Sequence, residues 1–115
     1  MRVESSHFPY LPVTLSLRGH RLEFEALLDT GFDGGLAVPE DTIAFGLSAA
    51  WKIRAYLADG SLVHAPAFRG TVRIGSLPPV TTTIIILGNA PVLGRAVADH
   101  HKITLDRGQR IVVEA

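Results

Sequence analysis

The sequence predicts an all-β protein, a small closed barrel with one or two short helices. Three observations lead to this fold class. Residues 12–28 alternate apolar and polar side chains, as half-buried strands do. Asp59-Gly60 separates two further strand-like stretches and is typical of a hairpin turn. Finally, helical patterns do not alternate with the strands, so the chain lacks the rhythm of a parallel α/β sheet.

The first half of the chain begins with a predicted β-hairpin over residues 12–28, in which residues 18–20 supply the turn. After a glycine-rich loop, a short strand is expected at residues 36–38. Pro39 then starts a helix, because proline already has the helical φ and the acids after it favour the positive end of the helix dipole. Gly46 limits this helix to a few residues.

A second, longer hairpin is expected from strands at residues 51–57 and 62–74, since Asp-Gly favours a tight two-residue turn. Pro66 interrupts its second strand and favours an edge position or a bulge. Residues 80–87 form a β-rich and nearly continuous apolar run. This run predicts a strand that is buried on both faces.

The C-terminal part is expected to contain one or two helical turns at residues 95–101. A final hairpin follows, with strands at residues 102–105 and 110–113. We expect the strand at residues 111–113 to be an exposed edge at which two chains pair.

Composition limits the kinds of function that the chain can have. Its 115 residues, 47% of them hydrophobic, predict one globular domain spanning residues 1–115. The 11 Lys and Arg balance the 11 Asp and Glu, so no net charge would attract nucleic acid or an anionic membrane. The absence of cysteine excludes disulfides, thiolate nucleophiles and cysteine-bound zinc. Without a signal-peptide pattern or a long apolar segment, we expect a soluble, cytoplasmic protein.

The five histidines raise the question of a metal site. His100 and His101 are adjacent, so in a helix their side chains would point about 100° apart. The sequence also lacks a His-x-x-x-His pair, which would place two ligands on one helix face. We therefore expect neither a metal ion nor a cofactor.

The end of the first predicted hairpin carries Asp29-Thr30-Gly31, which occurs once in the chain. Gly31 allows a close backbone approach, so that peptide N–H groups can surround the carboxylate. The Thr30 hydroxyl can both donate and accept hydrogen bonds. An ordinary surface turn is the alternative, because Asp, Thr and Gly are all frequent in turns. The apolar residues 26–28 favour instead a buried strand that presents Asp29 at its end.

The layout of residues 12–114 resembles that of the retropepsin-like aspartic proteases. A hairpin leads into the sequence Leu-Asp-Thr-Gly at residues 28–31, and a flap-like hairpin follows. A second apolar-apolar-Gly element, residues 92–94, then precedes Arg95. The extended sequence Asp-Thr-Gly-Phe-Asp-Gly most resembles prokaryotic members of this clan. The resemblance implies a barrel of the acid-protease type.

The resemblance also implies roles for individual residues. Asp29 would be the catalytic carboxylate, Thr30 would interlock the two active-site loops, and Gly31 would contact the substrate backbone. Asp33 would hold the substrate main chain and form an ion pair with Arg95.

Three further positions would contact the substrate. Asp59 and Gly60 would form the tip of the flap. Phe32 departs from the family pattern, because retroviral enzymes and pepsins usually carry Ala or Ser there. A bulky ring beside the reacting water would narrow the cleft.

The implied activity is that of an aspartic endopeptidase, a hydrolase acting on a peptide or protein substrate. Such chemistry uses two carboxylates that share one proton, and each chain supplies a single Asp29, so a homodimer is implied. One carboxylate would activate water while the other polarises the carbonyl, with an optimum at mildly acidic pH. The alternative is a catalytically silent dimerisation or peptide-binding module with the same fold.

Overall fold

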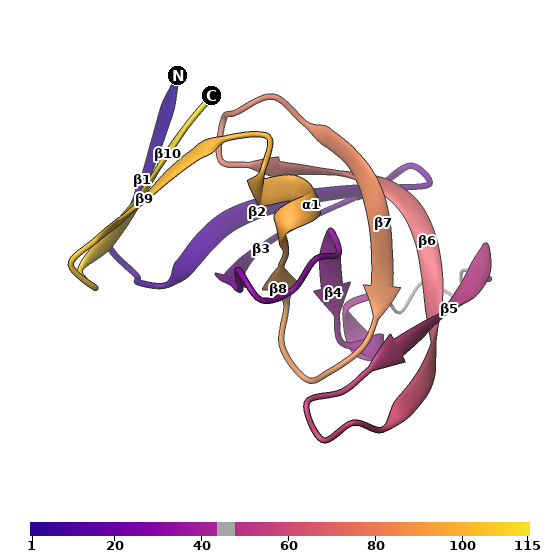
Figure 1. Cartoon of the computed structure of the whole chain (residues 1–115). Helices are drawn as coiled ribbons and strands as arrows, with labels where there is room; N and C mark the ends of the chain where they lie inside the picture. The colour runs from indigo at the N-terminus through magenta and orange to yellow at the C-terminus, as the bar shows by residue number, and fades with distance from the viewer. Residues whose placement is uncertain (44–47) are drawn as a thin grey trace.

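The computed structural model describes residues 1–43 and 48–115, whose strands form a seven-stranded and a three-stranded sheet (Figure 1). The strands are β1 (Arg2–Ser5), β2 (Tyr10–Leu17), β3 (His20–Leu28), β4 (Leu36–Val38), β5 (Trp51–Tyr56), β6 (Leu62–Ile74), β7 (Val80–Ile86), β8 (Val92–Leu93), β9 (Lys102–Asp106) and β10 (Arg110–Glu114). The helical segments are a 3₁₀ turn, η1 (Glu40–Ile43), and an α-helix, α1 (Arg95–Ala98).

The larger sheet closes on itself. Its strand order is β2-β3-β8-β4-β7-β6-β5, and β2 also pairs with β6, so every strand except β5 belongs to a closed ring of pairings. The expected all-β fold with a small closed barrel is thereby confirmed. The side chains that fill the ring are almost all aliphatic, with Phe68 as the largest fully buried one.

The first hairpin forms as predicted and begins two residues earlier. Strands β2 and β3 pair antiparallel from Tyr10↔Leu27 to Leu17↔His20. The turn between them consists of Arg18 and Gly19, which have φ values of 47° and 83°. Alternate residues of β2 point into the core and are at most 2% exposed. The period-two pattern therefore identified the buried face correctly.

The second hairpin consists of β5 and β6, and β5 with the first residues of β6 extends away from the ring (Figure 1). Its loop spans residues 57–61, because the strand pairing ends at Tyr56↔Leu62. The loop is therefore longer than the predicted two-residue turn. Pro66 pairs with Lys52 of β5, and pairing of β6 with β7 starts at the next residue. Its ring thus lies where β6 has a single paired neighbour, as the edge prediction required.

Strand β7 is buried on both faces only in its second half. Thr81 is exposed between buried neighbours, whereas Ile84 and Ile85 are both buried. The two short helical segments occur where the sequence predicted helix. Segment η1 is a 3₁₀ turn, and the predicted stop at Gly46 lies outside the described residues. Helix α1 is one turn long and ends at Ala98.

The three-stranded sheet brings the two chain termini together and has the order β1-β10-β9 (Figure 1). Strand β10 is therefore central, with β1 on one side and β9 on the other. The expectation of a free edge at residues 111–113 is wrong. It failed because β1, which the sequence analysis did not predict, occupies one side of β10. Within the described residues, the outer edges of this sheet are β1 and β9.

Candidate active site

Asp29 follows directly after β3, at a point where two strands run parallel. Leu28 of β3 pairs with Leu93 of β8, and the Asp29 amide donates a hydrogen bond to the Leu93 carbonyl oxygen at 3.0 Å. The next residues on the two strands are Asp29 and Gly94. The repeated apolar-apolar motifs noted in the sequence therefore lie side by side, and only one of them carries a carboxylate.

The carboxylate of Asp29 is exposed and is held by its own loop. The amide of Gly31 donates to Asp29 Oδ1 at 2.9 Å, and the amide of Phe32 donates to the Asp29 carbonyl oxygen at 3.2 Å. A Cβ atom at Gly31 would lie 3.2 Å from Oδ1, so glycine gives the carboxylate its space. The loop therefore fixes one carboxylate oxygen with a peptide N–H, as the motif predicted.

The loop at residues 32–35 is joined to the start of α1 through the main chain. The amides of Gly94, Arg95 and Ala96 donate to the carbonyl oxygens of Gly35, Phe32 and Gly34, at 2.9, 2.8 and 3.1 Å. A Cβ on Gly94 would overlap the Gly34 carbonyl oxygen and would lie 2.8 Å from that of Phe32. Gly94 is thus required by this close approach of two backbone segments.

Asp33 and Arg95 are neighbours in this arrangement, but the predicted ion pair between them is not among the ion pairs of the described residues. Asp33 is exposed and lines the cleft described next, whereas Arg95 lines a different cavity together with Thr30. Main-chain hydrogen bonds connect the two loops.

A cleft of about 580 Å³ lies between the Asp29 loop and the second hairpin. Its lining comprises the loop residues Gly31, Phe32, Asp33, Gly34 and Gly35, the β5 residues Ile53, Arg54, Ala55 and Tyr56, and Thr83, Ile85 and Leu87. The structure thus brings the predicted residues 31–33 together with the hairpin that was predicted to form a flap. Asp59 and Gly60 do not line this cleft.

The tip of the hairpin is ordered by Asp59. Its Oδ1 accepts hydrogen bonds from the amide of Ser61 at 2.8 Å and from Ser61 Oγ at 2.6 Å. These bonds, the side-chain one foremost, lower the pKa of Asp59. Gly60 has a φ of 87°, which favours glycine. Here both residues have turn-forming roles.

The ring of Phe32 lies on the glycines around it. A Cβ at Gly34 would lie 2.6 Å from the ring atoms Cε1 and Cζ, and one at Gly94 would lie 2.6 Å from Cδ2. The ring is half-buried and also forms part of the cleft wall. The absence of side chains at these two glycines therefore leaves room for the Phe32 ring.

The sequence analysis missed the cleft residues on β5. Arg54 and Tyr56 are both exposed, and Arg54 Nη2 donates to the Tyr56 hydroxyl at 3.4 Å. Arg54 and Tyr56 are separated by one residue on the strand before the Asp-Gly turn, so their side chains share one face. This spacing could have predicted that both contribute to the same surface of the hairpin. The sequence analysis also did not predict the burial of His101, whose ring nitrogens are buried without hydrogen-bond partners. Burial, and then the charge of His100, lower its pKa.

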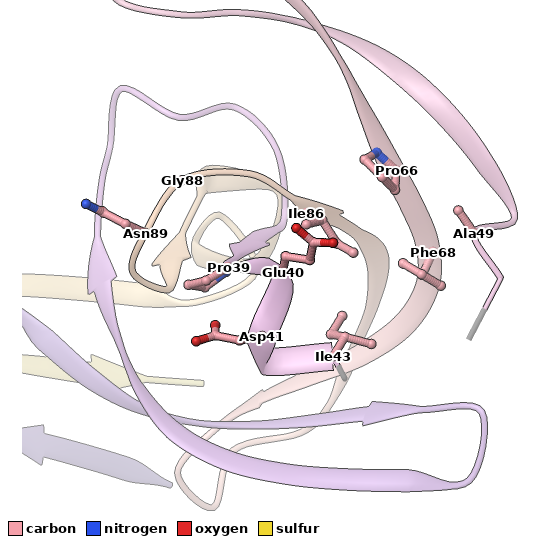
Figure 2. Close-up of a pocket in the computed structure, with 10 residues that line it drawn as sticks. All are labelled: Pro39, Glu40, Asp41, Ile43, Ala49, Pro66, Phe68, Ile86, Gly88 and Asn89. Atoms are coloured by element: carbon pink, nitrogen blue, oxygen red, sulfur yellow. The ribbon is translucent and has the colours of Figure 1, made fainter. Parts of the chain in front are cut away.

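A larger cavity lies elsewhere, between η1 and β6, and has a volume of about 820 Å³ (Figure 2). Figure 2 shows its lining, which includes Glu40 and Asp41 of η1, Phe68 of β6 and Ile86 of β7. No residue of the Asp29 loop contributes to the lining. The size of a cavity therefore does not identify the candidate site here, whereas the placement of Asp29 and of the second hairpin does.

Two further searches concern the described residues only. They contain no group of three or more His, Cys, Asp or Glu side chains that could hold a metal ion. They also contain no helix long and apolar enough to cross a membrane.

Comparisons with known proteins support the fold. A scan against protein-family models gave no match, and a search of curated protein sequences gave none either. Among solved structures, the chain is similar to a retropepsin-like aspartic protease from Rickettsia conorii, with a TM-score of 0.68. The similarity covers 98% of this chain and 89% of the other, at 14% sequence identity. The fold is therefore retropepsin-like.

Proposed function

We propose that this chain is an aspartic endopeptidase whose catalytic dyad consists of two Asp29 carboxylates, one from each chain of a homodimer. The observation that carries the proposal is the position of Asp29. It is an exposed carboxylate directly after the buried end of β3, anchored by the Gly31 amide, and its loop lines a cleft together with the second hairpin. An ordinary surface turn does not require this combination of features.

The proposed reaction needs a second carboxylate. Two carboxylates at short range cannot both ionise cheaply, so the pair shares one proton. The ionised member removes a proton from water, which attacks the scissile carbonyl carbon, while the protonated member donates a hydrogen bond to the carbonyl oxygen. The equivalent position of the same chain is Gly94, which has no side chain. A second copy is the natural source of the missing group.

Strand β9 offers the second copy a place to pair. Its outer edge is unpaired among the described residues, and Leu105 on it is 52% exposed. A cavity of about 280 Å³ lies against this edge and is lined by Ile103 and Leu105 together with Thr30 of the Asp29 loop. Pairing along β9 would therefore occur next to the proposed catalytic loops.

The sequence of β9, Lys-Ile-Thr-Leu-Asp, is complementary to itself in an antiparallel arrangement. With Thr104 opposite Thr104 of a second copy, Lys102 of each chain faces Asp106 of the other. Each Ile103 then faces the other Leu105, on the side of the cavity. Opposite charges and apolar pairs at directly opposed positions stabilise antiparallel strands. We therefore assign β9, rather than β10, as the pairing strand of the proposed dimer.

Replacing the proposed catalytic carboxylate tests the function. Asp29→Asn should abolish hydrolysis of an unstructured protein substrate at mildly acidic pH, because the amide can neither share nor accept the proton. Asp41→Asn removes one exposed carboxylate from η1 and should leave the activity unchanged. Equal activity of the two variants, or no activity of the wild-type protein, would contradict the proposal.

Cross-linking tests the dimer separately, and the absence of native cysteine makes the experiment clean. Thr104→Cys should form a disulfide-linked dimer on mild oxidation, since opposed Cα atoms of antiparallel strands are about 4.5–5.5 Å apart. Ser76→Cys, on an exposed turn away from β9, should stay monomeric. Cross-linking of both variants to the same extent, or of neither, would exclude the assigned edge.

The silent binding module is distinguished by an inhibitor. A pepstatin-type peptide imitates the transition state of aspartic proteases and should raise the unfolding temperature of an active dimer at acidic pH. The shift should disappear in Asp29→Asn. Binding of ordinary peptides without any inhibitor-induced shift would favour the module.

A further inference from the structure

Two adjoining cavities lie on the ring away from Asp29, over β2, β3, β6 and β7. Their volumes are about 460 and 170 Å³, and they share lining residues. We call them together the arginine groove, which is defined by Ser16, Arg21, Arg69, Thr71, Arg73 and Thr81. The strand register places these residues side by side, with Ser16 opposite both Arg21 and Thr71, and Thr71 opposite Thr81.

The charge of the groove differs from that of the protein as a whole. The protein has equal numbers of acidic and basic residues, yet no Asp or Glu lines either cavity. Arg18 and His20 add to the basic lining at one end. The nearby Glu23 pairs with Arg21 at 3.2 Å, and both of these side chains are largely exposed. Positive charge is therefore concentrated on this face.

Two of these arginines lack partners within the protein. Among the described residues, Arg69 and Arg73 form no hydrogen bond or ion pair, and Nε of Arg73 is buried without an acceptor. A buried donor without an acceptor is unfavourable, so a bound acceptor would stabilise it. Arg18 differs from them, because its Nη1 donates to the Ser48 carbonyl oxygen.

The spacing of the basic groups suits an extended chain. Arg69, Thr71 and Arg73 alternate along β6, so their side chains share one face and the two guanidinium groups originate about 13 Å apart. Carboxylates on every second residue of an extended peptide repeat at about 7 Å and match this spacing. No Phe, Tyr or Trp lines either cavity, so the stacking platform typical of single-stranded nucleic acid sites is missing.

We propose that the arginine groove binds an acidic polypeptide segment, in which Asp or Glu side chains on one face of an extended chain contact Arg69, Arg73 and Arg21. Hydroxyl groups of Ser16, Thr71 and Thr81 are available to donate further hydrogen bonds to the carboxylates. The groove and the cleft both reach strand β7. Thr83 lines the cleft, and Thr81 lines the groove on the same face of β7. The binding requires no catalysis, so it does not depend on Asp29.

Fluorescence anisotropy tests the proposal with a labelled peptide of about eight residues that alternates Glu and Ser, long enough to span the groove. The protein should carry Asp29→Asn, so that any proteolysis is removed from the measurement. We expect binding that weakens with salt, and about tenfold weaker binding when Arg69→Gln and Arg73→Gln are combined. The matched control combines Arg2→Gln and Arg107→Gln, which change the net charge equally outside the groove.

Three results would overturn the proposal. The control variant could lose as much affinity as the groove variant, which would indicate attraction by net charge only. The corresponding Lys-Ser peptide could bind as well as the Glu-Ser peptide. A labelled single-stranded oligonucleotide could bind more tightly than the peptide and lose its affinity in the groove variant, which would identify a nucleic-acid site instead. None of these results bears on whether Asp29 is catalytic.

Discussion

Replacing Gly34 by alanine tests how the Asp29 loop is packed against the ring of Phe32. The added Cβ would lie 2.6 Å from two ring atoms, and Phe32 supplies all three of the nearest contacts. An overpacked site of this kind costs about 1–3 kcal/mol. Because the ring alone is in the way, Gly34→Ala in a Phe32→Ala background should cost less than about 0.5 kcal/mol. The interaction free energy between positions 32 and 34 should therefore account for most of the destabilisation that Gly34→Ala causes by itself.

Gly94 provides the contrasting case. A Cβ there would meet the same ring at 2.6 Å, but also the backbone carbonyl oxygens of Gly34 and Phe32. Removing the ring leaves those backbone contacts, so Gly94→Ala should cost about 3 kcal/mol or more in both backgrounds. Its φ of −105° is open to any residue, so the cost is steric and does not come from backbone strain.

Urea unfolding followed by circular dichroism measures the wild-type protein, the single variants Phe32→Ala, Gly34→Ala and Gly94→Ala, and the two double variants that contain Phe32→Ala. Each free energy of unfolding is compared with that of its own background, so the cost of Phe32→Ala cancels. If Phe32→Ala relieved Gly94→Ala as fully as it relieves Gly34→Ala, the backbone approach described here would be wrong. A Gly34→Ala variant as stable as the wild-type protein would refute the packing of the ring.

Three further predictions concern titration and specificity. The pKa of Asp59 should rise in Ser61→Ala, because the Ser61 hydroxyl donates the hydrogen bond that lowers it most and the Ser61 amide bond remains; an unchanged pKa in NMR titration of the carboxyl would show that the hydroxyl bond does not form. Because burial and His100 lower the folded-state pKa of His101, the unfolded chain binds more protons, and stability should fall as pH drops through the unfolded pKa. His101→Phe should reduce the loss of unfolding free energy between about pH 7.5 and pH 5.5, as measured by urea unfolding. An identical loss in the variant would show that His101 does not cause it. If the chain is a peptidase, Phe32→Ala should raise the ratio of kcat/KM for substrates with bulky side chains to kcat/KM for substrates with small ones. An unchanged ratio would show that the Phe32 ring does not limit the size of side chain that the cleft accepts.

The parts of the fold that could be predicted from the sequence are those specified by neighbouring residues. Alternation along β2 and β3 gave both the hairpin and its buried face. The strand-like stretches on either side of Asp59-Gly60 gave the second hairpin, although its loop is longer than two residues. Such features depend on local periodicity and turn chemistry, which a single sequence carries.

The parts that could not be predicted depend on partners far along the chain. Strand β1 is short and polar, and it becomes a strand by pairing with β10 at the opposite end of the sequence. Because β1 was not predicted, β10 was expected to be an edge strand. In the structure β10 is central, and β9 is an outer strand of this sheet. In the site, the motif predicted that Asp29 follows a strand and is held by peptide N–H groups. The Asp33 and Arg95 side chains line different cavities and form no ion pair with each other, which depends on side-chain directions that only the fold determines.

The central claim is that two Asp29 carboxylates from different chains act as one dyad, and subunit mixing tests it most directly. Wild-type and Asp29→Asn chains are mixed in equal amounts, allowed to exchange subunits, and assayed for peptidase activity per wild-type chain. Random pairing leaves each wild-type chain with an inactive partner in about half of its dimers, so the activity per wild-type chain should fall to about half. Activity per wild-type chain that stays unchanged after complete exchange would show that one Asp29 suffices and would contradict the claim.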